Sequence, residues 1–242
     1  VFQAPMIVIV LVPIIFCLIL GAWNGSLIAY VGIQPIVATL ILMVAGRGIA
    51  QLVTNGQIIV FEHKPFEFIG GGFLFGLPFS CTIIMIIFAL LLYFTRRTAL
   101  GLFVESIGCN STASCYAGIK TTTIKMMVYI FSGLCCGVAG LITASDIKAA
   151  DANSAGLNME LEAILAVAIG GTAMNGGKFS LGGTVIGALI MQSLTTTILT
   201  RGVPVEVTAI LKALVVVFVF LLQSEDFQKL VSIKKLQGKM SQ

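Results

Sequence analysis

The sequence predicts an all-α protein, a polytopic bundle of transmembrane helices in which some helices are broken or re-entrant. Two observations carry this prediction. The 242 residues have a mean hydropathy of +1.07, and only 10% of them are charged, against about 25% in ordinary soluble domains. The charged residues lie almost entirely between apolar runs that are long enough to cross a bilayer as helices.

Two apolar runs lie near the start of the chain. The first covers residues 5–23 and is expected to end at the Asn24-Gly25 pair, a strong turn sequence. A short apolar piece at 26–31 and a Gly-x-Gln-Pro break at 32–35 precede a second run at 36–53. Broken helices are tolerated in a membrane where the break is buried in protein or lines a cavity.

The middle of the chain contains two further spans. Residues 54–77 are rich in Gly and Phe, and the alternation around 57–61 could make a short hairpin outside the membrane. A span at 78–94 follows, with a proline in its first turn. The longest polar stretch, 95–125, leads into a span at 126–144.

The last part of the chain has the densest glycine cluster. A helix at 160–169 is too short to cross alone, and the glycine-rich segment after it predicts a close-packed hairpin or a re-entrant element. Two more spans, 184–199 and 205–222, complete the bundle. The glycines expected to act as packing or hinge positions are Gly133, Gly137, Gly170, Gly171, Gly176 and Gly177.

Polar stretches never exceed the length of a loop, so residues 1–242 are expected to form one transmembrane permease domain. The basic residues fall into two clusters, one around 96–125 and one at the C-terminus, whereas the loops at 55–77 and 146–162 carry most of the acidic residues. The positive-inside rule predicts that the basic clusters are cytoplasmic and the two acidic loops are outside.

Few residues are candidates for a polar pathway. Lys212 lies deep in an apolar run, which costs about 2.5–3.5 kcal/mol on insertion scales unless the charge finds a partner. Asn24 and Gln34 flank the predicted break, so Asn24, Gln34 and Lys212 are possible members of a translocation path. An interfacial loop is an equally good explanation of Asn24 and Gln34.

Composition argues against several other functions. A soluble enzyme is excluded by the apolar content, and no catalytic site or cofactor is expected. Six cysteines without a CxxC pair, with one His, do not predict a metal site. The basic tail is better explained by contact with anionic lipid than by nucleic-acid binding, so the expected surroundings are a bilayer and no nucleic acid.

Short motifs along the whole chain resemble the permeases of ABC sugar importers, the ribose, galactose and galactofuranose group. Residues 106–119 read S-I-G-C-N-S-T-A-S-C-Y-A-G-I, similar to the family's A-I-G-G-N-x-x-A-A-x-x-x-G-I. The segment Q-P-I-V-A-T-L at 34–40, E-L-E-A-I at 160–164 and G-G-T at 170–172 follow in the family's order. The galactofuranose members are the most similar, through residues 36–48, 149–156 and 164–171.

The resemblance implies a multi-pass permease subunit in the bacterial inner membrane, with ATP hydrolysis in a separate cytoplasmic ABC ATPase. It also implies a second permease subunit, in a homo- or heterodimer, and a periplasmic sugar-binding protein. Segment 106–120 would be the coupling element that docks on the ATPase, through Ser106, Ile107, Gly108, Asn110, Ala113, Gly118 and Lys120. Family members carry further N-terminal spans with a G-G-I-D-L-S-V-G motif, which is expected to be missing here.

Two other functions remain open at this point. An ATP-independent secondary carrier would transport without an ATPase partner. A truncated, non-transporting membrane remnant would show no uptake even with its partners present.

Overall fold

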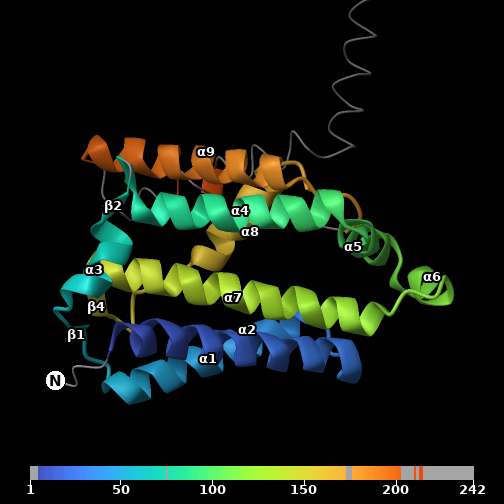
Figure 1. The fold of residues 1–242 in the computed structure, drawn as a ribbon, viewed down its shortest axis with the longest axis horizontal. Helices are drawn as coiled ribbons and strands as arrows, with labels where there is room; N and C mark the ends of the chain where they lie inside the picture. The colour runs from blue at the N-terminus through green and yellow to red at the C-terminus, as the bar shows by residue number, and fades with distance from the viewer. Residues whose placement is uncertain (1–4, 75, 173–175, 203–209, 211–212, 215–242) are drawn as a thin grey trace, which may run out of the picture. The chain divides into compact units, whose positions relative to one another are not determined.

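The computed structural model describes residues 5–74, 76–172, 176–202, 210 and 213–214 (Figure 1). Contacts divide the chain into two compact units, Val1–Leu157 and Asn158–Gln242. In both units the described residues are mainly helical. The predicted span at 205–222, with Lys212 in it, lies outside the described residues apart from residues 210 and 213–214.

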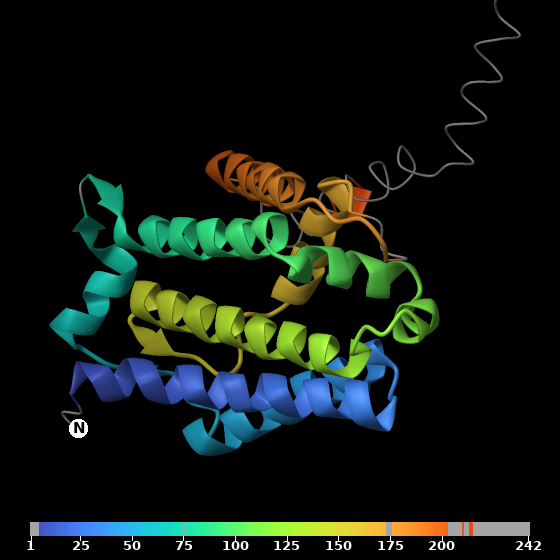
Figure 2. The ribbon, with the colours of Figure 1, turned by 45° about the vertical axis from the view of Figure 1, so that its right-hand side comes forward.

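The first unit is a bundle of long helices that run in alternating directions (Figures 1 and 2). These helices are α1 (Met6–Ser26), α2 (Pro35–Thr54), α4 (Phe79–Arg97) and α7 (Thr121–Ile147). The short helix α3 (Lys64–Gly71) lies at one end of the bundle, which we call the α3 end. Helices α5 (Ala99–Cys109) and α6 (Ser111–Tyr116) lie at the opposite end, the α6 end.

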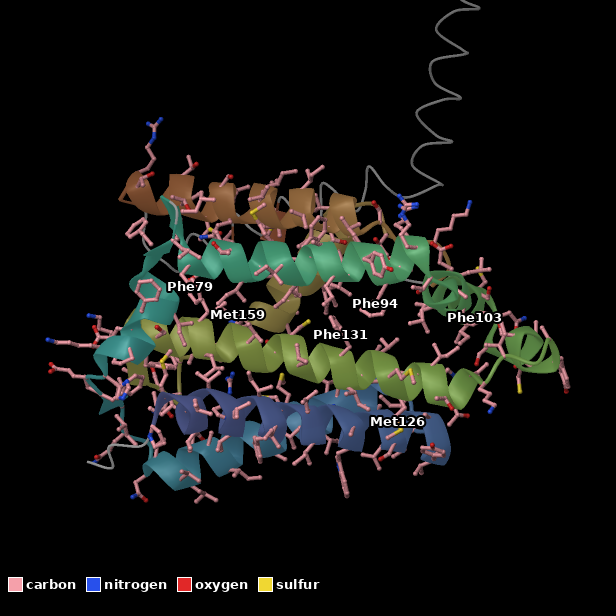
Figure 3. The ribbon with its side chains drawn as sticks, in the orientation of Figure 1. Phe79, Phe94, Phe103, Met126, Phe131 and Met159 are labelled. Atoms are coloured by element: carbon pink, nitrogen blue, oxygen red, sulfur yellow. The ribbon has the colours of Figure 1, made fainter. Side chains whose placement is uncertain are left out.

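The long helices have the length and surface of membrane spans. Apolar side chains project along them, as Phe94 on α4 and Phe131 on α7 illustrate (Figure 3), and α4 has no buried residue. An apolar surface of this extent suits lipid rather than water. Among the described residues, five helices are long and apolar enough to cross a membrane: Met6–Val31, Pro35–Thr54, Phe79–Arg97, Thr121–Ile147 and Leu181–Ile198. The prediction of an all-α, polytopic membrane protein is confirmed.

The first span is longer than expected. Helix α1 continues through Asn24 and Gly25 and passes into a π-helix, η1 (Leu27–Val31), so the prediction that this pair ends the span is wrong. The physical reason is packing, because a Cβ added at Gly25 would lie 3.2 Å from the Cβ of Tyr129 on α7. A turn there would also leave backbone groups unpaired in apolar surroundings. The break instead follows Gly32, whose φ is +78°, as the sequence predicts.

Two antiparallel pairs of two-residue strands lie in the first unit: β1 (Ile59–Val60) with β4 (Ala149–Ala150), and β2 (Phe73–Leu74) with β3 (Leu77–Pro78). The expectation of a local hairpin around 57–61 is wrong, because the partner of β1 is distant in sequence. Helix α7 ends at Ile147, and Lys148 has a left-handed φ of 56° that turns the chain back. That turn places 149–150 beside 59–60.

Side-chain hydrogen bonds join the same two connections. The Gln51 amide donates to the side-chain oxygen of Asn153 (3.0 Å), and the Asn153 amide donates to the carbonyl of Gly56 (2.9 Å). Asp151 accepts from the backbone N–H groups of Asn153 and Ser154, at 2.8 and 3.2 Å. These bonds lower the pKa of Asp151 below its ordinary value. The segment after α7 is therefore held in a defined turn.

The apolar core of the first unit lies at the α3 end. It consists of Phe66 and Ile69 from α3 and Leu141 from α7, which expose 3%, 7% and 8% of their surface. Burying one such side chain fully stabilises a fold by about 1.5–3 kcal/mol. Phe61 adds an edge-to-face contact with Phe66, with ring centroids 5.4 Å apart. Helix α3 is therefore docked on α7 by apolar packing.

The second unit contains α8 (Met159–Ile169) and α9 (Leu181–Thr200), which pack on each other. The predicted short helix at 160–169 and the span at 184–199 correspond to these two helices. Ser180 precedes α9, and its hydroxyl accepts from the Gly183 N–H at 3.1 Å. The Ser180 N–H in turn donates to the Thr172 hydroxyl at 3.2 Å, so a polar turn joins the glycine-rich segment to α9.

Candidate functional site

Asn110 builds the junction between α5 and α6. Its side-chain oxygen accepts from the N–H groups of Thr112 and Ala113, both at 3.0 Å. This is an N-cap, which satisfies two donors that a helix start leaves free and is worth about 1 kcal/mol. The Ser114 hydroxyl donates back to the Asn110 carbonyl at 2.9 Å, and Ser114 is buried. One asparagine therefore fixes how α6 leaves α5.

A glycine closes the other side of α6. The Ile119 N–H donates to the Ser114 carbonyl (3.1 Å) and the Gly118 N–H to the Cys115 carbonyl (3.0 Å). Gly118 has a φ of +85°, a left-handed conformation that residues with a Cβ adopt at a cost. The chain can thus reverse from α6 into α7 within four residues, 117–120.

Helix α6 presents its surface outward at the α6 end of the first unit. Tyr116 exposes 89% of its surface, an unusual value for an aromatic side chain. The basic residues Arg96 and Arg97 end α4, and Lys120 precedes α7. The α6 end is therefore an exposed and basic surface.

The structure refines the predicted segment 106–120, which is not one loop. Ser106, Ile107 and Gly108 lie in the last turn of α5, and the Ser106 hydroxyl donates to the Leu102 carbonyl at 2.8 Å. Asn110 is the junction and Ala113 lies within α6. Gly118 and Lys120 belong to the turn before α7. The apolar character of 99–109 could have indicated α5 from the sequence.

Gly133 and Gly137 lie on the face of α7 that contacts α1. A Cβ added at Gly133 would clash with the Cys17 carbonyl oxygen and lie 3.1 Å from the Cα of Gly21. A Cβ at Gly137 would lie 3.1 Å from the Cβ of Cys17. Only residues without a side chain let two helix backbones approach so closely. Gly140, one turn further along, has nothing within 4 Å.

The predicted glycines of the second unit fall into two groups, one in close helix packing and one with a positive φ. Gly170 packs on α9, where an added Cβ would lie 2.5 Å from the Gly183 carbonyl carbon. Gly171, Gly176 and Gly177 lie outside the helices and have φ values of +79°, +90° and +100°. Their positive φ values explain why glycine stands there, and a Cβ added at Gly171 would meet nothing within 4 Å.

Two of the predicted path residues lie within the described residues, and they differ in their surroundings. Asn24 exposes 8% of its surface, and its side-chain oxygen has no hydrogen-bond partner. A buried acceptor without a partner is costly and uncommon in native structures. Gln34 precedes α2 and is exposed. The structure therefore singles out Asn24 as a buried acceptor beside a π-helix.

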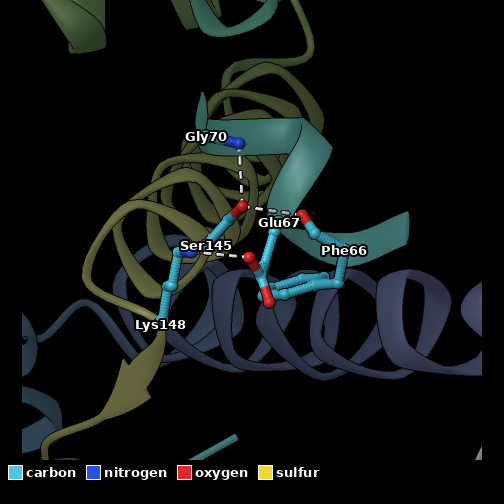
Figure 4. Close-up of polar contacts among 5 residues, drawn as sticks. All are labelled: Phe66, Glu67, Gly70, Ser145 and Lys148. Carbon is cyan, nitrogen blue, oxygen red and sulfur yellow. Dashed lines mark hydrogen bonds and ion pairs between the residues drawn. The ribbon is translucent and has the colours of Figure 1, made fainter. Parts of the chain in front are cut away.

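A cluster at the α3 end was not expected from the sequence (Figure 4). Ser145 on α7 exposes 1% of its surface, and its hydroxyl donates to the Phe66 carbonyl and accepts from the Gly70 N–H, both at 2.7 Å. Lys148 forms an ion pair with Glu67 at 2.6 Å. A single serine in an apolar helix forms no repeating pattern, so the sequence did not indicate this contact.

The ion pair shifts both of its groups. The hydrogen bond from Lys148 lowers the pKa of Glu67, and the same bond raises the pKa of Lys148. The lowered Glu67 pKa stabilises the fold above the unfolded carboxyl value of about 4.3, and this contribution is lost as pH falls through the folded-state value. The raised Lys148 pKa stabilises it below the unfolded amine value of about 10.4, and this contribution is lost as pH rises through the folded-state value.

We expect the melting-temperature difference between the protein and its Lys148→Gln variant to be small at pH 7 and to vanish near pH 3. The difference is small because Lys148 is 56% exposed and solvent weakens such pairs. Thermal unfolding in detergent at the two pH values measures it. A difference that persists at pH 3 would mean that Lys148 acts through packing rather than through Glu67.

Two concave regions flank α7. A groove of about 390 Å³ between α4 and α7 has an apolar lining in which Thr143 and Cys135 supply the polar side-chain atoms, so it offers a sugar few hydrogen bonds. A recess of about 320 Å³ at the α3 end is lined by Lys64, Glu67 and Lys148, among others. Within the described residues, no three His, Cys, Asp or Glu side chains gather closely enough to hold a metal ion.

Long apolar helices joined through glycine faces define a polytopic helical membrane protein. A family described as branched-chain amino acid transport system / permease component matches residues 1–220. The chain belongs to this family of transport permeases.

Characterised relatives are named for sugars. The chain is 50% identical over 211 residues to the galactofuranose transporter permease protein YtfT of Escherichia coli, across 87% of this chain and 62% of that protein. It is 37% identical over 225 residues to the fructose import permease protein FruF of Bifidobacterium longum (91% and 63%). It is 34% identical over 218 residues to the ribose import permease protein RbsC of Haemophilus influenzae (88% and 67%). The chain thus spans less than two thirds of the length of the first two relatives. No solved structure matches it.

Proposed function

We propose that the chain is the membrane-spanning permease subunit of an ABC sugar importer and couples to a cytoplasmic ATPase through the α6 end. The proposal depends on one combined observation: the chain belongs to a permease family, and its coupling-like segment has a suitable geometry. The relatives described above are permeases named for galactofuranose, fructose and ribose. The segment that resembles the family's coupling motif forms a capped, exposed helix.

The partners follow from this role. Two permease subunits would form the pathway, two ATPase subunits would bind the α6 ends, and a periplasmic binding protein would deliver the sugar to the α3 ends. ATP hydrolysis would take place in the ATPase, and this chain would perform no covalent chemistry. The glycine contacts between α1 and α7 and between α8 and α9 would let helices move as packed pairs.

The charge distribution supports the orientation. Arg96, Arg97 and Lys120 gather at the α6 end, whereas Glu62 and Asp146 lie at the α3 end with the Glu67–Lys148 pair. Cytoplasmic segments carry the excess of Lys and Arg, so the α6 end would be cytoplasmic. Asn24 is the described residue best suited to the translocation path, because its buried side-chain oxygen can accept a hydrogen bond from a sugar hydroxyl or water.

The test is two charge substitutions at the α6 end of the first unit, with a control at the α3 end. Asn110→Arg removes the cap of α6 and adds a bulky charge to its surface, and Gly108→Arg adds the same charge in the last turn of α5. We expect either variant to lower ATP-driven sugar uptake by at least about tenfold, the effect of about 1.4 kcal/mol, while ATP hydrolysis continues. Gln57→Arg places the same charge in an exposed connection at the α3 end and is the control.

Four results would contradict the proposal or its orientation. Normal uptake by both Asn110→Arg and Gly108→Arg would remove the coupling role of α6. Uptake into vesicles without ATP would favour a secondary carrier, and no uptake by the unchanged chain with its partners would favour a remnant. Cys109 and Cys115 are exposed near α6, so an impermeant thiol reagent that labels them from outside intact cells would reverse the orientation.

A further inference from the structure

The Ser145 hydroxyl occupies a special position on α3. It bridges the carbonyl of Phe66 and the N–H of Gly70, with both distances 2.7 Å (Figure 4). These two groups are four residues apart and are the pair that an uninterrupted α-helix joins directly. A side chain of α7 therefore bonds the same two backbone groups that the hydrogen-bond ladder of α3 pairs.

This contact gives the Phe66 and Gly70 backbone groups two satisfied arrangements. When α3 is docked, Phe66 and Gly70 bond to Ser145. When α3 is released, the Gly70 N–H can bond the Phe66 carbonyl directly, and the Ser145 hydroxyl can bond the carbonyl of Leu141 one turn earlier in α7. Neither arrangement leaves the Phe66 carbonyl, the Gly70 N–H or the Ser145 hydroxyl without a partner, which would otherwise oppose the change. An element with two such arrangements can act as a switch.

The segments around α3 suit a hinged movement. His63 precedes the helix in an extended conformation, with φ −140°, and Gly71 and Gly72 end it. A Cβ added at Gly71 would meet nothing within 4 Å, so no neighbouring element is packed against that side of the helix end. The recess of about 320 Å³ beside Glu67 and Lys148 leaves space on one side of the docked helix.

Helix α7 connects this switch to the α6 end. It runs without a break for 27 residues from Thr121, directly after the turn that closes α6, to Ile147, two residues beyond Ser145. A displacement of α6 would therefore reach Ser145 through one rigid helix.

We propose that α3 is a detachable cap on the α3 end of the bundle, docked on α7 through Ser145 in one state of the transport cycle and released in the other. The proposal rests on the proposed function, because transport supplies the cycle. It assigns to Ser145 the role of a positioning residue. The Glu67–Lys148 pair and the packing of Phe66 and Ile69 hold the docked state together with it.

The first test locks the cap. Glu67→Cys and Lys148→Cys shorten two side chains whose charged ends lie 2.6 Å apart, so a short bis-methanethiosulfonate reagent that replaces the lost length should join α3 to the end of α7 through disulfides. In the complete transporter with its ATPase, in proteoliposomes, we expect the crosslink to lower ATP-driven uptake by about tenfold or more, with recovery on reduction. The control joins Gln51→Cys to Asn153→Cys, which contact each other at the same end without involving α3. This control should leave uptake unchanged.

The second test unlocks the cap and needs no transport. A Cβ at Gly70 would lie 2.7 Å from the backbone nitrogen of Asp146, whereas one at Gly71 would meet nothing within 4 Å. Gly70→Ala should therefore push α3 off α7 and lower the crosslink yield of the Glu67→Cys/Lys148→Cys pair by about tenfold. Gly71→Ala should leave the yield unchanged.

The outcomes separate the two proposals. A disulfide-locked transporter that takes up sugar normally would overturn the cap, and so would a Gly70→Ala variant that crosslinks as well as Gly71→Ala. If the unmodified chain takes up no sugar with its partners, the proposed function fails. The crosslink yields of the two alanine variants then still decide whether α3 detaches from α7.

Discussion

Gly133→Leu is expected to separate α1 from α7 and to destabilise the first unit by about 3 kcal/mol or more. The leucine would meet the Cys17 carbonyl and the Gly21 backbone of α1, and backbone atoms cannot rotate aside as a flexible side chain can. Thermal unfolding in detergent, followed by size-exclusion chromatography, measures the loss. We expect a lower melting temperature and a smaller monodisperse fraction.

Gly140→Leu is the matched control. It replaces a glycine on the same helix with the same side chain, at a position with nothing within 4 Å. We expect a change within about 0.5 kcal/mol. Equal effects at Gly133 and Gly140 would show that loss of a glycine in α7 matters by itself, and that the contact with α1 does not.

Gly187→Leu is expected to have a comparable effect in the second unit. Gly187 is buried in α9, and a Cβ there would clash with the Ala166 carbonyl oxygen of α8 and lie 3.1 Å from the Gly170 nitrogen. Accommodating four extra carbons requires α8 and α9 to move apart, at a cost of about 3 kcal/mol. Protease susceptibility of the folded protein in detergent would rise at the connection between the two helices.

Gly182→Leu serves as the comparison for that variant. Gly182 lies in the first turn of α9 and is exposed, with nothing within 4 Å. We expect its protease pattern to match that of the unchanged protein. If Gly182→Leu and Gly187→Leu were cleaved alike, the close approach of α8 and α9 would not be what stabilises the second unit.

Local sequence patterns were sufficient where one segment decides its own structure. The apolar run at 126–144 predicts a span because a backbone in lipid must satisfy its own hydrogen bonds, and α7 contains that whole run. The break before Pro35 was equally predictable, since Gly32 and Pro35 limit the local backbone. The Asn24-Gly25 pair was misleading. A turn inside the membrane would leave backbone hydrogen-bonding groups without partners, so the chain continues as a helix there.

Contacts between distant segments could not be predicted in this way. A Gly-x-x-x-Gly spacing shows that Gly133 and Gly137 can pack closely, but not that their partner is Cys17 and Gly21 of α1. The alternation at 57–61 indicates a strand, yet Ala149–Ala150 is its partner only because α7 returns the chain to that end. Ser145 could not be found in this way, because pattern analysis needs several residues at a regular spacing.

Sequence patterns were enough to identify a helical membrane protein of the permease family and to locate most of its described helices. Helix formation in lipid is a local requirement of each backbone segment, so it can be inferred segment by segment. Packing established which glycines lie against a neighbouring helix, that Asn24 is a buried acceptor, and that Ser145 bonds the Phe66 carbonyl and the Gly70 N–H of α3. Those features depend on which segments become neighbours, and that is set by the packing of the bundle.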